Sequence, residues 1–105
     1  MKVVIQSAAD LGRVIRASRK AQGLRLDDVA GGAQLSPVFV GDAERGKDSA
    51  QIGKVLHLMR ELGVKLSVEI PDSFQPHLDR LTAQGIRPAK KRPAGFRSST
   101  GEKSE

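Results

Sequence analysis

The 105-residue sequence contains no cysteine, no tryptophan and no tyrosine, and it contains only three phenylalanines. Without cysteine, disulfides, thiolate nucleophiles and cysteine-ligated zinc are excluded, and two histidines far apart in the sequence make a poor metal cluster. With so few aromatic rings, binding that stacks bases on aromatic side chains has almost no residues to use. No apolar run approaches the length of about 18 residues that a membrane span needs, and no signal-peptide pattern opens the sequence. We therefore expect a cytoplasmic chain with no membrane partner, no metal and no cofactor.

Positive charge exceeds negative charge, with 18 basic and 12 acidic residues and a formal charge of +6. Residues 1–71 contain 11 basic and 8 acidic side chains, and residues 72–105 contain 7 and 4. In the second segment the basic residues concentrate between positions 87 and 97, among prolines, glycine and serines and without an acidic residue. This composition indicates one domain over 1–71 and a basic, largely flexible tail over 72–105. Such a tail either keeps the chain soluble or adds a weak, sequence-independent grip on phosphates.

Hydrophobic periodicity predicts a mainly α fold, a bundle of four to five helices. The capping signals are Ser7 with Asp10, Ser36 before Pro37, and Ser49, since serine and aspartate satisfy free backbone N–H groups at a helix start. The expected helices cover residues 7–22, 26–33, 37–45 and 50–62, with a further weak helix over 74–84.

The period changes from 3.6 to 2 in residues 64–70, where apolar side chains alternate with Lys65, Ser67 and Glu69. Alternation of this kind, closed by Pro71, predicts a short β-strand. A strand needs a partner for its backbone, and residues 2–6, with a similar β-branched bias, could supply one within the chain.

A set of linked motifs over residues 8–65 resembles the Cro/C1-type (XRE-family) helix-turn-helix module in order and spacing. The matching stretches are Leu11-Gly12-x-x-Ile15-Arg16-x-x-Arg19-Lys20-x-x-Gly23-Leu24, Asp27-Asp28-Val29-Ala30, Leu35-Ser36, Val40-x-x-Ala43-Glu44-Arg45-Gly46-Lys47 and Leu56-x-x-Met59-x-x-Leu62-Gly63-Val64. The resemblance implies a DNA-binding module whose third helix enters the major groove. It also implies a structural ion pair between Arg19 and Glu44.

The resemblance assigns DNA contacts to the third helix and to the helix ends. The base-facing positions are Ser36, Pro37, Val38, Phe39 and Asp42. The phosphate-facing positions are Arg25, Arg45 and Lys47. Family members usually place hydrogen-bonding side chains at the base-facing positions, whereas valine and phenylalanine only touch a thymine methyl or pack inward. Direct readout is therefore unusual, biased toward thymine methyls, or weak.

A module of this type followed at once by a strand is similar to HipB-type antitoxins, whose dimers pair such strands in a small sheet. The expected dimer strand consists of Val64, Lys65, Leu66, Ser67, Val68, Glu69 and Ile70. Antiparallel pairing about Ser67 places Lys65 of one chain opposite Glu69 of the other.

The preferred interpretation is a homodimeric repressor that binds a palindromic operator in double-stranded DNA and acts as the antitoxin of a HipBA-like operon, with a HipA-like kinase toxin as a further partner. Such a protein would be associated with the nucleoid when bound to DNA. The alternative is an interaction module that neutralises a toxin and binds DNA only weakly and without sequence preference. An enzyme is not expected, because neither His57, on the expected wet side of the fourth helix, nor His77 stands beside a plausible nucleophile.

Overall fold

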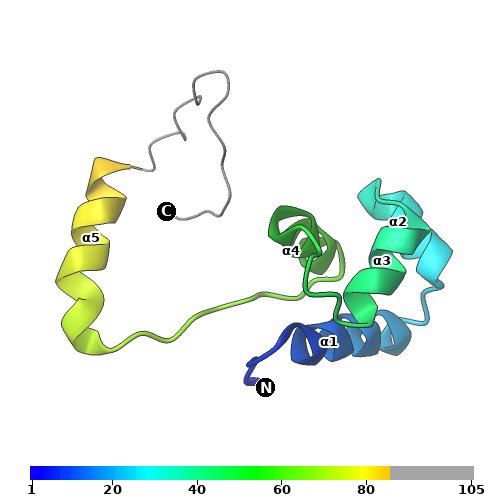
Figure 1. Ribbon diagram of the computed structural model, residues 1–105, viewed down its shortest axis with the longest axis horizontal. Helices are drawn as coiled ribbons and strands as arrows, with labels where there is room; N and C mark the ends of the chain where they lie inside the picture. The colour runs from blue at the N-terminus through cyan, green and yellow to red at the C-terminus, as the bar shows by residue number, and fades with distance from the viewer. Residues whose placement is uncertain (86–105) are drawn as a thin grey trace. The chain divides into compact units, whose positions relative to one another are not determined.

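The computed structural model describes residues 1–85, and these contain five α-helices and a short 3₁₀ helix (Figure 1). The elements are α1 (Ala8–Ala21), α2 (Leu26–Ala33), α3 (Pro37–Glu44), α4 (Ile52–Glu61), η1 (Asp72–Phe74) and α5 (Gln75–Gln84). The chain divides into two compact units, Met1–Val68 and a second unit that begins at Glu69. The mainly helical prediction is confirmed. The basic cluster predicted between residues 87 and 97 lies outside the described residues.

Two hydrogen bonds define the start of α1. The hydroxyl of Ser7 accepts the backbone N–H of Asp10 at 3.0 Å, and the carboxylate of Asp10 accepts the backbone N–H of Gln6 at 3.0 Å. The bond from Gln6, with a smaller effect of Arg13, holds the pKa of the Asp10 carboxyl below its usual value of 3.8. The bond to the Ser7 hydroxyl confirms the predicted cap. Asp10, an acidic residue in the first turn, also complements the positive end of the helix dipole.

Residues 34–36 make a tight turn between α2 and α3. Gln34 takes the left-handed conformation (φ 59°, ψ 41°), and the N–H of Leu35 donates to the carbonyl of Ala30 at 2.9 Å. Ser36 then caps α3, since its hydroxyl accepts the N–H of Phe39 at 3.0 Å, and Pro37 occupies the first turn. The predicted start of the third helix is therefore confirmed.

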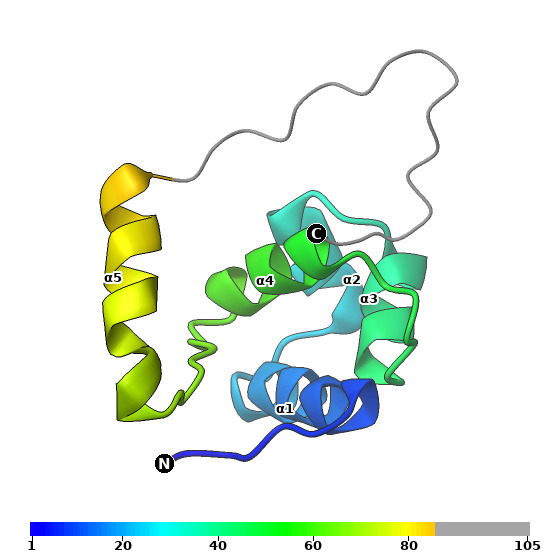
Figure 2. The same cartoon turned by 60° about the vertical axis from the view of Figure 1, so that its left-hand side comes forward.

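The helices α1 to α4 enclose one small core, in which α3 packs against α1 and α2, and α2 packs against α4 (Figures 1 and 2). The largest fully buried side chains are Ile15, Leu58, Met59 and Val40. Gly12 allows the close approach of α1 to α3, because a Cβ there would lie 2.6 Å from the carbonyl oxygens of both Ala43 and Glu44. The two helices can therefore pack this closely only because Gly12 has no side chain.

The fourth helix begins later than the sequence predicts. Its cap position is Gln51, not Ser49, because residues 47–50 form a turn in which the N–H of Ala50 donates to the carbonyl of Lys47 at 3.2 Å. The expectation that His57 lies on the wet side of this helix is also wrong: the side chain is half-buried, and its Nε2 lies 2.8 Å from the carbonyl oxygen of Ala33. The cause is the packing of α2 on α4, which leaves a carbonyl at the end of α2 in need of a donor.

The predicted strand at 64–70 is absent from the single chain, and so is the predicted strand at 2–6, since residues 1–85 contain no strand. Of the alternating apolar residues only Val64 packs against the core, whereas Leu66 and Val68 are 42% and 80% exposed. The physical reason is the lack of a partner edge. A lone segment cannot satisfy strand hydrogen bonds, so it stays without regular structure.

The second unit, as far as it is described, contains η1 and α5. The helix α5 agrees with the weak helix expected over residues 74–84. Phe74 of η1 and the α5 residues Leu78 and Leu81 are all exposed. Within residues 1–85 no helix is long and apolar enough to cross a membrane.

Candidate nucleic-acid interface

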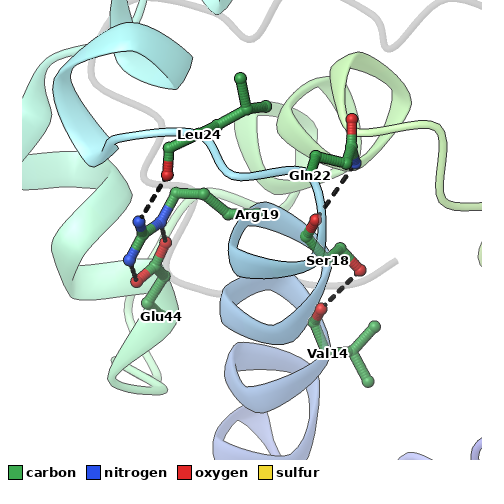
Figure 3. Close-up of polar contacts among 6 residues, drawn as sticks. All are labelled: Val14, Ser18, Arg19, Gln22, Leu24 and Glu44. Carbon is green, nitrogen blue, oxygen red and sulfur yellow. Dashed lines mark hydrogen bonds and ion pairs between the residues drawn. The ribbon is translucent and has the colours of Figure 1, made fainter.

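An ion pair between Arg19 of α1 and Glu44 of α3 joins these two helices (Figure 3). Arg19 Nε donates to Glu44 Oε2 at 2.6 Å and Arg19 Nη2 donates to Glu44 Oε1 at 3.0 Å, so the contact is bidentate. Arg19 Nη1 also donates to the carbonyl oxygen of Leu24 at 2.9 Å. One guanidinium thus connects the end of α1, the segment before α2 and the end of α3.

The pair is shielded from solvent, since the side chains of Arg19 and Glu44 are 12% and 5% exposed. Hydrogen bonding to Glu44 raises the pKa of Arg19 above its ordinary value, and a guanidinium is charged in proteins in any case. Charge-assisted, bidentate bonds in a sheltered place fix geometry strongly. The ion pair that the resemblance implied is present, and it sets the position of α3 relative to α1.

The residues assigned to base contact differ in how far they face outward. Pro37 is exposed, and Val38, at 71% exposure, presents its side chain to solvent. Phe39 is half-buried against the core. The Nζ atom of Lys54 lies 5.7 Å from the centroid of its ring, a cation–π contact. The hydroxyl of Ser36 is used as the helix cap. The outward face at the start of α3 is therefore mainly apolar.

The cations assigned to phosphate contact lie at helix ends. Arg25 is the cap residue of α2; it is exposed, and it makes no ion pair with any residue of 1–85. Arg45 and Lys47 follow α3, and both contact the same carboxylate, that of Asp42. The distances are 2.7 Å from Arg45 Nη2 to Oδ1 and 3.4 Å from Lys47 Nζ to Oδ2. The structure therefore brings two of the three predicted phosphate ligands together.

The state of the Asp42 carboxyl follows from these neighbours. Partial burial raises its pKa, but hydrogen bonds from Arg45 and Lys47 outweigh that effect and leave the pKa below its usual value. Asp42 is therefore ionised at neutral pH. The resemblance places Asp42 at a base-facing position and predicts neither contact, although Asp42 and Arg45 are three residues apart at the end of α3, a spacing at which opposite charges meet.

The residues expected in a dimer strand do not form a structured site in the single chain. Lys65, Ser67 and Glu69 are exposed, as are the apolar residues Leu66, Val68 and Ile70 that alternate with them. The segment therefore leaves an apolar and hydrogen-bonding edge uncovered.

Comparisons with known proteins agree with this geometry. The chain is 43% identical over 67 residues to the "Uncharacterized HTH-type transcriptional regulator y4mF" of Sinorhizobium fredii, a match that covers 64% of this chain and 88% of that protein. Among solved structures, the fold is similar to a HipB complex with an O4 20mer (TM-score 0.61, 13% identity, 66% of this chain and 97% of that chain). It is also similar to a variant of HipB in complex with an O2 20mer (TM-score 0.62, 13% identity, 67% of this chain and 97% of that chain). No protein-family model matches the chain. The resemblance to helix-turn-helix proteins and to HipB that the sequence predicted is confirmed.

Proposed function

This chain belongs to the helix-turn-helix-type transcriptional regulators, and we propose that it is a sequence-specific repressor that serves as the antitoxin of a HipBA-like operon, with a HipA-like kinase as its toxin partner. The observation that carries the DNA-binding part is the arrangement of α3. This helix is locked to α1 by a buried ion pair, exposes its first turn, and has two basic residues directly after its end. The HipB complexes with 20mers, to which the fold is similar, support the same reading.

Docking would place the first turn of α3 in the major groove. There Pro37 and Val38 would contact base edges, and apolar side chains of this kind favour the methyl group of thymine. Arg25, Arg45 and Lys47 would contact backbone phosphates, which fix the register of the protein without reading sequence.

A homodimer completes this proposal. The exposed apolar residues Leu66, Val68 and Ile70 support a partner for the segment 64–70, as does its backbone, which pairs with no strand within residues 1–85. Two copies that pair antiparallel about Ser67 would cover these side chains and form the strand that a single chain lacks. The two-fold axis would then present two α3 helices to successive major grooves, about 34–36 Å apart, of a palindromic operator.

A gel-shift titration on the DNA upstream of the protein's own gene tests this function, with a random duplex of equal length as the competitor. We expect a specific complex at moderate salt. The variant Arg25→Gln should weaken binding to both duplexes and reduce the steepness of the log–log salt dependence by about 0.9, the value for one lost phosphate contact.

Arg16→Gln is the matched control for the charge change, because Arg16 is an exposed arginine on α1 outside the proposed interface. It should leave the affinity and the salt dependence close to those of the unmodified protein. Equal affinity for the upstream fragment and the random duplex would contradict sequence-specific repression.

A second candidate function is supported by the apolar character of the first turn of α3. A helix whose first turn exposes Val38 and part of the Phe39 side chain, and no hydrogen-bonding side chain beside them, also suits a protein partner. In this case the chain neutralises a toxin, and its DNA binding stays non-specific. Tight binding of a co-expressed toxin together with equal affinity for any duplex would favour this function over repression.

A further inference from the structure

The side chain of Asp42 holds two cations in the way that a DNA phosphate would. One carboxylate oxygen accepts a hydrogen bond from Arg45 and the other lies within ion-pair distance of Lys47, so the two basic side chains share one anion. Arg45 also lies close against the surface of α3, because a Cβ at Gly41 would be only 3.2 Å from its Nη1 atom. The guanidinium therefore occupies a defined place beside the carboxylate.

We propose that Asp42 is an internal competitor for DNA phosphate: it occupies Arg45 and Lys47 and thereby limits the sequence-independent affinity of the protein for nucleic acid. This inference rests on the proposed DNA-binding function and assigns Asp42 a role other than base contact. In this role Asp42 acts on DNA binding through its neighbours and does not itself touch the DNA.

The exposure of the three side chains explains why the contact would lower affinity without preventing binding. Arg45 and Lys47 are 69% and 56% exposed, so a phosphate can reach both of them from solvent. Exposed ion pairs are weak, and a phosphate can therefore displace the carboxylate. Each displacement leaves a carboxylate close to the phosphate, and this repulsion reduces the gain from the new contact.

Base readout by Asp42 explains the geometry less well. A carboxylate that accepts a hydrogen bond from a cytosine amino group must point an oxygen at the base edge, whereas both oxygens of Asp42 face the cations Arg45 and Lys47. Moving the side chain toward a base would break both contacts and bring a negative charge near the phosphates.

The test compares Asp42→Asn with Asp48→Asn in the full-length chain. Both variants remove one negative charge from the same region, but within residues 1–85 Asp48 makes no ion pair, so its loss reports only the general change in charge. Binding of each variant to a random duplex and to the upstream fragment is measured by fluorescence anisotropy between about 50 and 200 mM salt. Circular dichroism checks that both variants remain folded.

We expect Asp42→Asn to bind the random duplex roughly tenfold more tightly at about 50 mM salt and roughly threefold more tightly at about 200 mM, as for one additional phosphate contact. Its log–log salt dependence should be steeper by about 0.9. Asp48→Asn should show a much smaller gain. In a background that carries Arg45→Gln and Lys47→Gln, the effect of Asp42→Asn should disappear.

Three results would overturn the proposal. An equal gain in both variants would show that only net charge matters, and a loss of affinity in Asp42→Asn would show that the carboxylate assists binding. An unchanged affinity would show that it does neither. The random duplex keeps this test separate from the proposed function: if the protein does not prefer the upstream fragment, specific repression fails, while the comparison of the two variants is still decided.

Discussion

Replacing Glu44 by glutamine would remove the negative charge from the buried ion pair while keeping the shape of the side chain. Arg19, only 12% exposed, would then retain its bond to the carbonyl of Leu24 and a single amide oxygen in place of a carboxylate. Breaking a buried pair on one side costs about 3–5 kcal/mol, because the remaining charge stays away from water without its partner. Small domains are stable by about 5–15 kcal/mol in total. We therefore expect Glu44→Gln to lose about 3 kcal/mol, a large share of the free energy of unfolding.

Urea denaturation followed by far-UV circular dichroism measures this loss, and all variants are compared at one protein concentration because dimerisation would add to the apparent stability. The control is Arg13→Gln, which breaks the ion pair of Arg13 with Asp10 at a site where the arginine is 71% exposed. That change should cost no more than about 1 kcal/mol.

A double variant separates the loss of charge pairing from the loss of packing. Arg19→Met combined with Glu44→Leu leaves no buried charge and should recover much of the stability that Glu44→Gln loses. If Glu44→Gln costs no more than Arg13→Gln, the buried ion pair does not hold α1 and α3 together, and the reasoning is refuted.

Local signals explain why most helix starts could be predicted from the sequence. Ser7 with Asp10 and Ser36 with Pro37 act within one helical turn, so the residues alone specify the hydrogen bonds that the structure contains. Ser49 is the same kind of capping residue but does not cap α4. It lies inside the turn over residues 47–50, which the bond from the N–H of Ala50 to the carbonyl of Lys47 closes. A capping residue predicts a helix start only where no competing turn forms.

Non-local contacts account for the errors. Periodicity within α4 does not reveal that the end of α2 approaches His57, so its burial could not be predicted from the helix alone. Residues 64–70 have the alternation of a strand, but a strand also needs a second edge, which the single chain does not provide. Sequence pattern therefore indicates which side chains share a face, and the available partners decide whether the element forms.

The candidate site shows the same division. The pairing of Arg19 with Glu44 could be anticipated only through the resemblance, since 25 positions separate the two residues in the sequence. Asp42 and Arg45 are three positions apart, and this spacing allows an ion pair. The resemblance also assigns Arg45 to a DNA phosphate, and spacing alone does not decide whether Arg45 pairs with the Asp42 carboxylate or with that phosphate. In the structure the carboxylate of Asp42 holds Arg45.

Two further predictions concern helix packing and dimerisation. Gly12→Ala should destabilise the chain by about 1–3 kcal/mol in urea denaturation, because its Cβ would meet backbone oxygens of α3 at 2.6 Å. The control Gly31→Ala, with nothing within 4 Å of its Cβ, should stabilise α2 by up to about 1 kcal/mol. Equal effects of the two substitutions on the free energy of unfolding would disprove the close approach of α1 and α3. Lys65→Glu should weaken the proposed dimer several-fold in analytical ultracentrifugation, because about 0.2–1 kcal/mol per cross-strand pair is lost twice by symmetry and replaced by repulsion from Glu69. Adding Glu69→Lys restores opposite charges in that register only, so a double variant as weakly dimeric as Lys65→Glu would rule out antiparallel pairing of residues 64–70.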